Sequence, residues 1–223
     1  ISRALADAGV ETRFVHGLRY TSKEVMAVVD SVLHDEVNAH LVRVLNELNG
    51  KPFALSGRSV LRAERIPGRD PATGAYEDLG QVGRVVNVDS EQIHWVLNRR
   101  ETPVLTPIGC DMNGALYNIN ADMAACRVAG FLRARKLVFL SDVPGILRDP
   151  DCENSLISSV SVREVEDMIA DGTIAGGMVP KIRSAAEALH AGCQKVHMID
   201  GRVRHSLLLE IFTDRGVGTQ ITH

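Results

Sequence analysis

The sequence predicts an α/β fold, a three-layer αβα sandwich with a mostly parallel central sheet. Short segments rich in apolar residues alternate with segments in which apolar residues recur at helical spacing. One of the short segments, Lys136–Leu140, is apolar almost throughout, as expected for a strand that helices cover on both faces. Such an alternation favours right-handed crossovers, which bring the strand-to-helix turns to the sheet edge where ligands bind.

The N-terminal part is expected to hold two long helices and several strands. Thr21 or Ser22 is suited to cap a helix that carries Val25, Val28 and Val29 on one face. A second helix is expected from about Asp35 to Asn49, where Gly50 ends it. The expected strands are 13–15, 51–55, 83–88 and 102–108, with a helix of 90–97 capped by Ser90 and a loop or hairpin tip over 65–80.

The C-terminal part continues the alternation. After a helix over Asp122–Leu132 come the strands 136–140 and 195–199. Ser161 is suited to cap a helix that runs through Ile169. Another helix is expected to open at Val179 or Pro180 and to run through Ala191, and a short one is expected over 206–210.

The composition excludes several classes of protein. The 223 residues carry a formal net charge of −3, which argues against a nucleic-acid surface. No apolar run approaches the ~20 residues that span a bilayer, so we expect no membrane partner. The four cysteines are widely spaced, which favours reduced, buried thiols in a cytoplasmic protein over a disulfide framework.

Three short segments indicate a site for phosphoryl transfer. They are Tyr117–Asp122, Ser141–Ile146 and Gly176–Lys181. Each combines turn or glycine chemistry with polar groups that suit a phosphate or a small acid. Lys181 stands in the first turn of a helix, where a cation opposes the helix dipole, and such a local conflict is typical of a functional residue.

Each segment also has an ordinary structural interpretation. Ser141–Ile146 fits a plain strand-to-helix turn, and Lys181 fits a solvated surface lysine. Asn118, Asn120 and Asp122 fit loop and capping positions, although their amides could bind a substrate and Asp122 could orient lysines or a magnesium shell. The histidines form no metal-ligand pattern, so no protein-bound metal is expected, and neither a P-loop nor a Gly-x-Ser-x-Gly elbow occurs.

The chain resembles the acetylglutamate kinases of the amino acid kinase family. The runs that carry the resemblance occur in the family's order: Gly17–Arg19, Leu55–Gly57, Asp78–Gly83, Pro107–Gly109, Tyr117–Asp122, Ser141–Ile146, Gly176–Lys181 and Ile199–Arg202. The resemblance implies that ATP, as its Mg²⁺ complex, phosphorylates the γ-carboxylate of N-acetyl-L-glutamate in arginine biosynthesis. It also implies one kinase domain over 1–223, with an acetylglutamate-binding and dimer lobe over about 1–135 and a nucleotide-binding lobe over about 136–223.

The resemblance assigns a role to each site residue. Arg19, Asn118 and Asn120 would bind acetylglutamate, Lys181 would stabilise charge on the transferring phosphoryl group, and Asp122 would organise the lysines. The nucleotide would lie against Ser141, Asp142, Val143, Pro144, Gly145, Ile146, Thr173, Ile174 and Ala175.

The C-terminal run resembles the arginine-inhibited branch of the family. His205, Glu210 and Gly216 would there hold the inhibitor arginine. The alternative is a helix and turn that merely close the domain. The resemblance also implies a homodimer, in which helices near residues 22–49 pack across a two-fold axis, or a hexamer built from such dimers.

One departure from the family concerns the start of the chain. The family's first strand, with its lysine and glycines, and its His-Gly-Gly-Gly loop have no match here, and Ile1 aligns just after them. We therefore expect an N-terminally incomplete domain that is nearly inactive by itself. Two other classes stay open: a non-catalytic arginine-sensing domain, and a kinase that acts on aspartate, carbamate or a nucleoside monophosphate.

Overall fold

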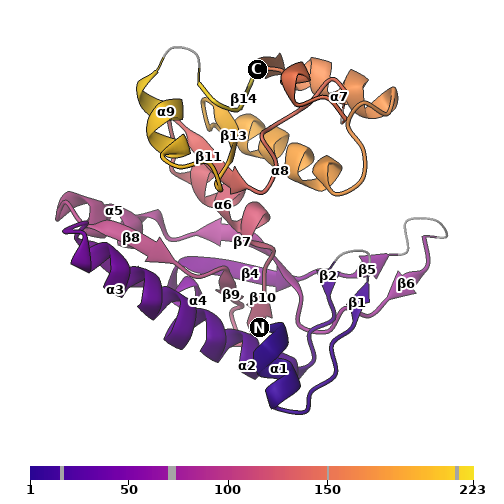
Figure 1. Cartoon of the computed structure of the whole chain (residues 1–223). Helices are drawn as coiled ribbons and strands as arrows, with labels where there is room; N and C mark the ends of the chain where they lie inside the picture. Colours follow the sequence, from indigo (N-terminus) through magenta and orange to yellow (C-terminus); the bar gives the residue numbers. More distant parts are fainter. Residues whose placement is uncertain (16–17, 70–73, 150, 214–215) are drawn as a thin grey trace. The chain divides into compact units, whose positions relative to one another are not determined.

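The computed structural model describes residues 1–15, 18–69, 74–149, 151–213 and 216–223. The chain divides into two compact units, Ile1–Ala124 and Ala125–His223 (Figure 1). The boundary lies inside helix α6 (Ala121–Phe131).

The N-terminal unit is built on a mixed four-stranded sheet, with the order β10-β9-β4-β7, and on the parallel pair β3-β8. Strand β4 is antiparallel to β7 and meets β9 in the parallel sense. The strands of this unit are β1 (Phe14–Val15), β2 (Leu18–Arg19), β3 (Pro52–Leu55), β4 (Leu61–Arg65), β5 (Gly68–Arg69), β6 (Tyr76–Glu77), β7 (Gly83–Val88), β8 (Thr102–Leu105), β9 (Ile108–Cys110) and β10 (Leu116–Asn118).

One uninterrupted helical run replaces the two helices that the sequence predicted. Ser22 caps α2 (Lys23–Ser31), which continues through a π-helical segment, η1 (Val32–Asn38), into α3 (Ala39–Glu47). No glycine or proline interrupts this run, so nothing forces it to break. The extra residue of the π turn leaves Asn38 buried, where its Nδ2 donates a hydrogen bond to Val104 O at 2.7 Å.

Two further local expectations are corrected. Asp89, not Ser90, caps α5 (Ser90–Asn98), because the Asp89 carboxylate accepts hydrogen bonds from the N–H groups of Glu91 and Gln92. The strand expected over 102–108 is two strands, β8 and β9, since Thr106 and Pro107 leave the ladder. The Thr106 hydroxyl instead accepts a hydrogen bond from Gly57 N at 3.0 Å, at the start of α4 (Gly57–Val60).

The segment over 65–80 forms the short antiparallel hairpin β5–β6, in which Gly68 faces Glu77. Residues 70–73, which include Pro71 of the predicted loop, lie outside the described residues. The remaining helix of this unit is α1 (Ser2–Asp7), whose Leu5 packs with Val25, Met26, Val29 and Ile108 in an apolar cluster.

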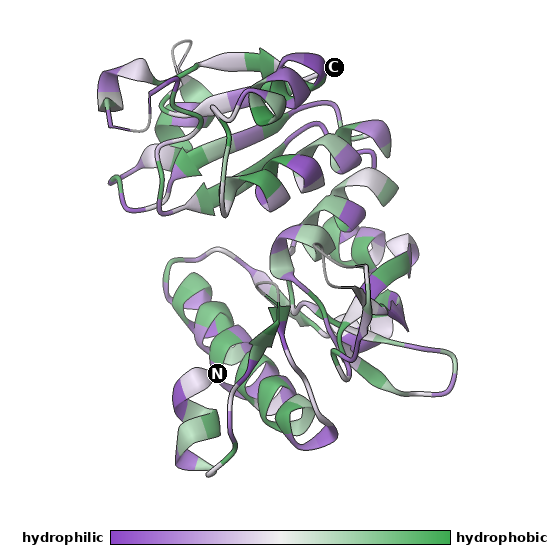
Figure 2. Ribbon diagram, turned by 90° about the vertical axis from the view of Figure 1, so that its right-hand side faces the viewer, coloured by the Kyte–Doolittle hydropathy of each residue, from purple (hydrophilic) through white to green (hydrophobic). Residues whose placement is uncertain are grey.

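The C-terminal unit surrounds a sheet with the order β11-β13-β14-β12, in which β11 is parallel to β13 and β14 is antiparallel to it. Figure 2 shows green stretches in the strands of this unit, in keeping with the apolar residues of β11 and β13. Its elements are α6, β11 (Leu137–Ser141), η2 (Glu153–Ser155), β12 (Ser159–Ser161), α7 (Val162–Ala170), α8 (Met178–His190), β13 (Val196–Asp200), α9 (Ser206–Phe212) and β14 (Thr219–Thr222).

Burial of one continuous apolar cluster holds the C-terminal unit together. Phe139, Ile182, Met198 and Ile221 meet in this cluster, so β11, α8, β13 and β14 all contribute to it. Ser161 caps α7 in a reciprocal capping box with Glu164, as the sequence predicted for the cap. The predicted α/β class is confirmed, with sheets that mix parallel and antiparallel pairs.

The four cysteines are thiols, as predicted, but they are not uniformly buried. Cys126 and Cys193 are buried, Cys110 is half-buried and Cys152 is exposed. In the described part of the chain, no helix has both the length and the apolar character to cross a bilayer.

Candidate active site

Arg19 ends strand β2 in the N-terminal unit and is half-buried. Its guanidinium donates hydrogen bonds to Ser2 Oγ at 2.9 Å and to Thr12 Oγ1 at 3.3 Å. It also lies over the ring of Phe14, 4.6 Å from the ring centroid. These contacts hold a planar cationic fork in one place, as recognition of a carboxylate requires. Gly17, in the predicted turn, lies outside the described residues.

Asn118 ends strand β10 and comes close to the segment that carries Arg19. Its Nδ2 donates a hydrogen bond to Thr21 Oγ1 at 3.2 Å, and its backbone N–H donates to Gln81 O at 2.9 Å. The structure therefore brings two of the predicted substrate-binding segments together, although they are far apart in sequence.

Asn120 and Asp122 stand at the start of α6. Asn120 Oδ1 accepts a hydrogen bond from Met123 N at 3.1 Å, so its side chain occupies a capping position. Asp122 is half-buried in the first turn of the helix, where an anionic side chain is favoured by the helix dipole. The contact of Asn120 and the helix position of Asp122 are those that the structural interpretation expects of capping and first-turn residues.

The two predicted nucleotide segments meet at one pocket of the C-terminal unit. The pocket has a volume of about 280 Å³. Its lining residues are Val143, Gly145, Ile146, Leu147, Gly172, Thr173, Ile174, Ala175 and Met178. Ser141, Asp142 and Pro144 do not line it, and Ser141 Oγ instead donates to Asp142 Oδ1 at 3.3 Å. The largely apolar walls suit a flat heterocycle such as a nucleotide base.

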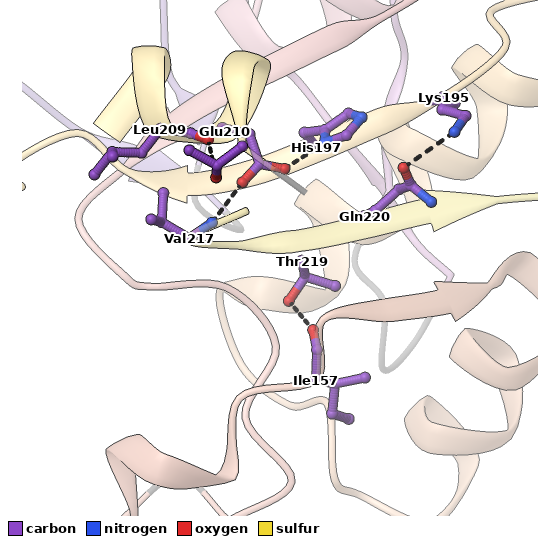
Figure 3. Close-up of polar contacts among 9 residues, drawn as sticks. Ile157, Lys195, His197, Leu209, Glu210, Val217, Thr219 and Gln220 are labelled. Atoms are coloured by element: carbon purple, nitrogen blue, oxygen red, sulfur yellow. Dashed lines mark hydrogen bonds and ion pairs between the residues drawn. The ribbon is translucent and has the colours of Figure 1, made fainter. Parts of the chain in front are cut away.

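The turn that forms one wall of this pocket depends on Gly145. Its φ is +143°, and an added Cβ would lie 2.5 Å from Thr219 Oγ1. The buried Thr219 hydroxyl accepts a hydrogen bond from Ile146 N at 2.8 Å. It donates one to Ile157 O at 2.7 Å, as Figure 3 shows. The hydroxyl of Thr219 therefore fixes the turn that contains Gly145 to strand β14.

Lys181 lies in the first turn of α8, and Met178 at the start of this helix lines the same pocket. The preceding Gly176 and Gly177 face open space, since a Cβ built on either would meet nothing within 4 Å. The chain thus presents an uncovered glycine pair, a helix N-terminus and a half-buried lysine next to one another. Each of these three features favours an anion.

A second pocket, of about 270 Å³, contains Glu210 and Gly216. Glu210 Oε1 lies 2.5 Å from His197 Nδ1, and Glu210 Oε2 accepts a hydrogen bond from Val217 N at 2.8 Å (Figure 3). Gly216 has a φ of +61°, and a Cβ there would lie 2.8 Å from Glu210 Oε2. Only glycine therefore fits at this position without a clash with the Glu210 carboxylate.

The structure does not bring His205 to the Glu210 pocket. His205 has a φ of +61° just before α9, and its Nε2 accepts a hydrogen bond from Arg204 Nε at 3.1 Å. The histidine of the pocket is His197, and Lys136 also lines it. Sequence reasoning missed both residues. The available signal was a histidine among the apolar residues of strand β13 (Val196–Asp200), because a buried histidine needs polar partners.

The hydrogen bonds around Glu210 determine its protonation. Burial opposes its ionisation, but the donors Val217 N–H, His197 and Gly218 N–H outweigh burial and hold the pKa of Glu210 below its ordinary value. Glu210 is therefore an anion at neutral pH. The other ring nitrogen, His197 Nε2, is buried and has no hydrogen-bond partner among the described residues.

The comparisons with known proteins identify the family. The sequence profile of the amino acid kinase family matches residues 1–200. The acetylglutamate kinase of Akkermansia muciniphila is 44% identical over 222 residues, which are 99% of this chain and 74% of that protein. The chain therefore belongs to the amino acid kinase family, among the acetylglutamate kinases.

Solved structures support the same fold. The protein smu.665 of Streptococcus mutans has a TM-score of 0.78 and 29% identity, over 99% of this chain and 81% of that one. N-acetylglutamate synthase of Neisseria gonorrhoeae, solved with coenzyme A and L-arginine, has a TM-score of 0.78 and 27% identity, over 99% of this chain and half of that one. The predicted αβα fold and the predicted enzyme class, a phosphotransferase, are confirmed.

The environment of Glu210 predicts a pH-dependent stability. Because the pKa is lowered on folding, its contribution is complete above the unfolded value of about 4.3 and is lost as the pH falls through the folded value. Glu210→Gln should reduce the free energy of unfolding in urea by about 2 kcal/mol at pH 7, and by progressively less below about pH 4.

Glu187→Gln, at an exposed glutamate on α8, controls for the removal of one negative charge. A difference between wild type and Glu210→Gln that stays constant from neutral to acid pH would contradict this account.

Proposed function

We propose that this protein transfers the γ-phosphoryl group of ATP to the γ-carboxylate of N-acetyl-L-glutamate, as a step of arginine biosynthesis. The carboxylate oxygen bonds to the γ-phosphorus, the bond from that phosphorus to the β,γ-bridging oxygen breaks, and ADP leaves with N-acetyl-L-glutamyl 5-phosphate. The observation that carries the proposal is 44% identity to an acetylglutamate kinase over 99% of the chain.

The acceptor in this reaction is already an anion and needs no general base. Catalysis then depends on positioning two negatively charged reactants and on cations that stabilise the transferring group. Mg²⁺ would arrive with ATP as part of the substrate. Among the described residues, no cluster of histidine, cysteine, aspartate and glutamate could hold a metal of its own.

Nucleotide binding is proposed for the pocket between Val143–Leu147 and Gly172–Ala175. Its apolar walls support a role in holding the base. Gly176, Gly177 and the N-terminus of α8 would accept the phosphates, because the two glycines leave open space there and the helix dipole attracts anions. Ser141, Asp142 and Pro144 would contribute from the same turn.

Substrate binding is proposed for Arg19 and Asn118 in the N-terminal unit. The fixed guanidinium of Arg19 suits a carboxylate, and the amide of Asn118 suits the polar groups of an acetylated amino acid. Asn120 would add a further amide. Lys181 would stabilise charge on the transferring phosphoryl group, and Asp122 would orient the cations around it.

Lys181→Met tests the catalytic assignment. We expect kcat of the intact protein to fall about 10²–10³-fold, since a cation lost from the transition state typically costs that much, with little change in thermal stability. The assay traps the acyl phosphate with hydroxylamine. Arg183→Met, at an exposed cation two residues along the same helix, should retain activity. A Lys181→Met protein with wild-type kcat would remove Lys181 from the mechanism.

Feedback inhibition by arginine is proposed for the Glu210 pocket. The pocket offers a carboxylate to a guanidinium and the Lys136 ammonium to an α-carboxylate. The synthase from Neisseria gonorrhoeae, to which this chain is similar, was solved with L-arginine. That likeness also favours a second candidate function, a non-catalytic arginine-sensing domain, which wild-type turnover in the hydroxylamine assay would refute.

Arginine at millimolar concentration should raise the thermal unfolding midpoint of the wild type and of His205→Ala. Lys136→Met should weaken arginine binding about tenfold or more and abolish the shift at the same concentration, because the α-carboxylate loses its cation. A shift lost in His205→Ala but retained in Lys136→Met would move the proposed site to His205. No shift in the wild type would remove arginine regulation.

A homodimer, alone or within a hexamer, is proposed through the helical run α2–η1–α3. Among the residues of α3 none is fully buried, and apolar side chains of this run and its end are exposed: Val37, Leu41 and Leu48. A second copy of the chain offers the same apolar surface, as a two-fold interface requires.

Leu41→Glu should lower the mass in solution measured by light scattering, to about half when the wild type is a dimer, because a two-fold interface contains the introduced charge twice. Met112→Glu, at a methionine that is 82% exposed in a turn, is the matched control and should leave the mass unchanged. If Leu41→Glu keeps the wild-type mass, this run of helices is not the interface.

A further inference from the structure

We propose that Thr21 is a positioning residue that fixes Arg19 and Asn118 relative to one another for binding of acetylglutamate. The proposal rests on the proposed function, since it concerns the same substrate. The sequence predicts for Thr21 only a possible role as a helix cap. In the structure Ser22 caps α2, and the hydroxyl of Thr21 has other partners.

The Thr21 side chain links the two substrate-binding residues directly. Its hydroxyl donates a hydrogen bond to Arg19 O at 2.9 Å and accepts one from Asn118 Nδ2 at 3.2 Å. A hydroxyl that donates on one side and accepts on the other has no rotational freedom left. The bond from Nδ2 also fixes the orientation of the Asn118 amide plane. One hydroxyl oxygen therefore joins the Asn118 side chain to the backbone carbonyl of Arg19.

The backbone of Thr21 is held as firmly as its side chain. Thr21 N donates to Leu79 O at 3.0 Å, and Gln81 N donates to Thr21 O. Gly80, between them, has a φ of +70°, and a Cβ there would lie 2.1 Å from Thr21 O. Only glycine allows this close approach of two backbone segments.

The segment that holds Thr21 also holds Asn118. Gln81 O accepts from Asn118 N at 2.9 Å, and Gln81 Nε2 donates to Leu116 O at 2.9 Å. Thr21 and Asn118 are thus fixed by the same short segment, Leu79–Gln81, and Thr21 itself is fully buried. Such rigid support is what a site needs to hold a small substrate in one geometry.

A purely structural role of Thr21 would change the measured KM values and stability in a different way. A threonine that only stabilises the fold would affect binding of ATP and of acetylglutamate alike, or would affect unfolding alone. A threonine that positions Arg19 and Asn118 changes the KM for acetylglutamate selectively.

The experiment compares Thr21→Val, which keeps the shape of the side chain and removes the hydroxyl, with Thr21→Ser, which keeps the hydroxyl and removes the methyl group. In the intact protein we expect Thr21→Val to raise the KM for acetylglutamate about tenfold while the KM for ATP is unchanged, and Thr21→Ser to retain the wild-type value. If Thr21→Val does not fold, Thr21→Ser and Thr21→Ala form a second pair that differs only in the hydroxyl.

Three results would overturn the inference: an unchanged KM for acetylglutamate in Thr21→Val, an equal rise in both KM values, or a Thr21→Ser protein as impaired as Thr21→Val. Failure of the proposed function would be visible separately. In that case the wild type itself would neither phosphorylate acetylglutamate nor be stabilised by it in thermal unfolding, and the inference would fall with it.

Discussion

A loop can hold a ligand in a fixed geometry only if its own polar groups have hydrogen-bond partners before the ligand arrives. In each of the two units, a buried threonine hydroxyl supplies such partners. Thr21 satisfies Arg19 O and the Asn118 amide, and Thr219 satisfies Ile146 N and Ile157 O. Both threonines are fully buried. Each hydroxyl donates to a carbonyl and accepts from an N–H group, so one small side chain joins distant segments.

Glu210 shows the same principle with a charge. Moving a carboxylate out of water is costly, and a carboxylate without partners would instead be protonated. Three donors, two of them backbone N–H groups, keep Glu210 ionised in a small polar pocket. A carboxylate has more acceptor positions than these contacts use, so it still has capacity for a guanidinium. Its neighbour Gly216 leaves that side of the carboxylate accessible.

Local sequence signals predicted local structure well and long-range contacts poorly. Ser161 was predicted as a cap, and Ser22 was one of two candidates together with Thr21, because a cap acts on the residues that follow it. Asp89 was missed in favour of Ser90, since adjacent polar residues compete for one position and only geometry decides. The π-helical segment and the contacts of Thr21 and His197 depend on partners up to 97 residues away, which no local pattern encodes. The resemblance likewise chose His205, whereas the pocket contains His197.

The position of Lys181 in α8 opposes the helix dipole. A cation in the first turn of α8 adds to the positive end of the helix dipole, and no side chain caps this helix. Gly176 and Gly177 add backbone flexibility that folding must restrict. Such an arrangement lowers the stability of the unliganded protein by a small amount, and an anionic ligand at the helix N-terminus would offset that loss by linkage. The unfavourable start of this helix and the proposed affinity for phosphate therefore have one physical origin, which is why a sequence that violates helix preferences at this point is informative about the proposed function.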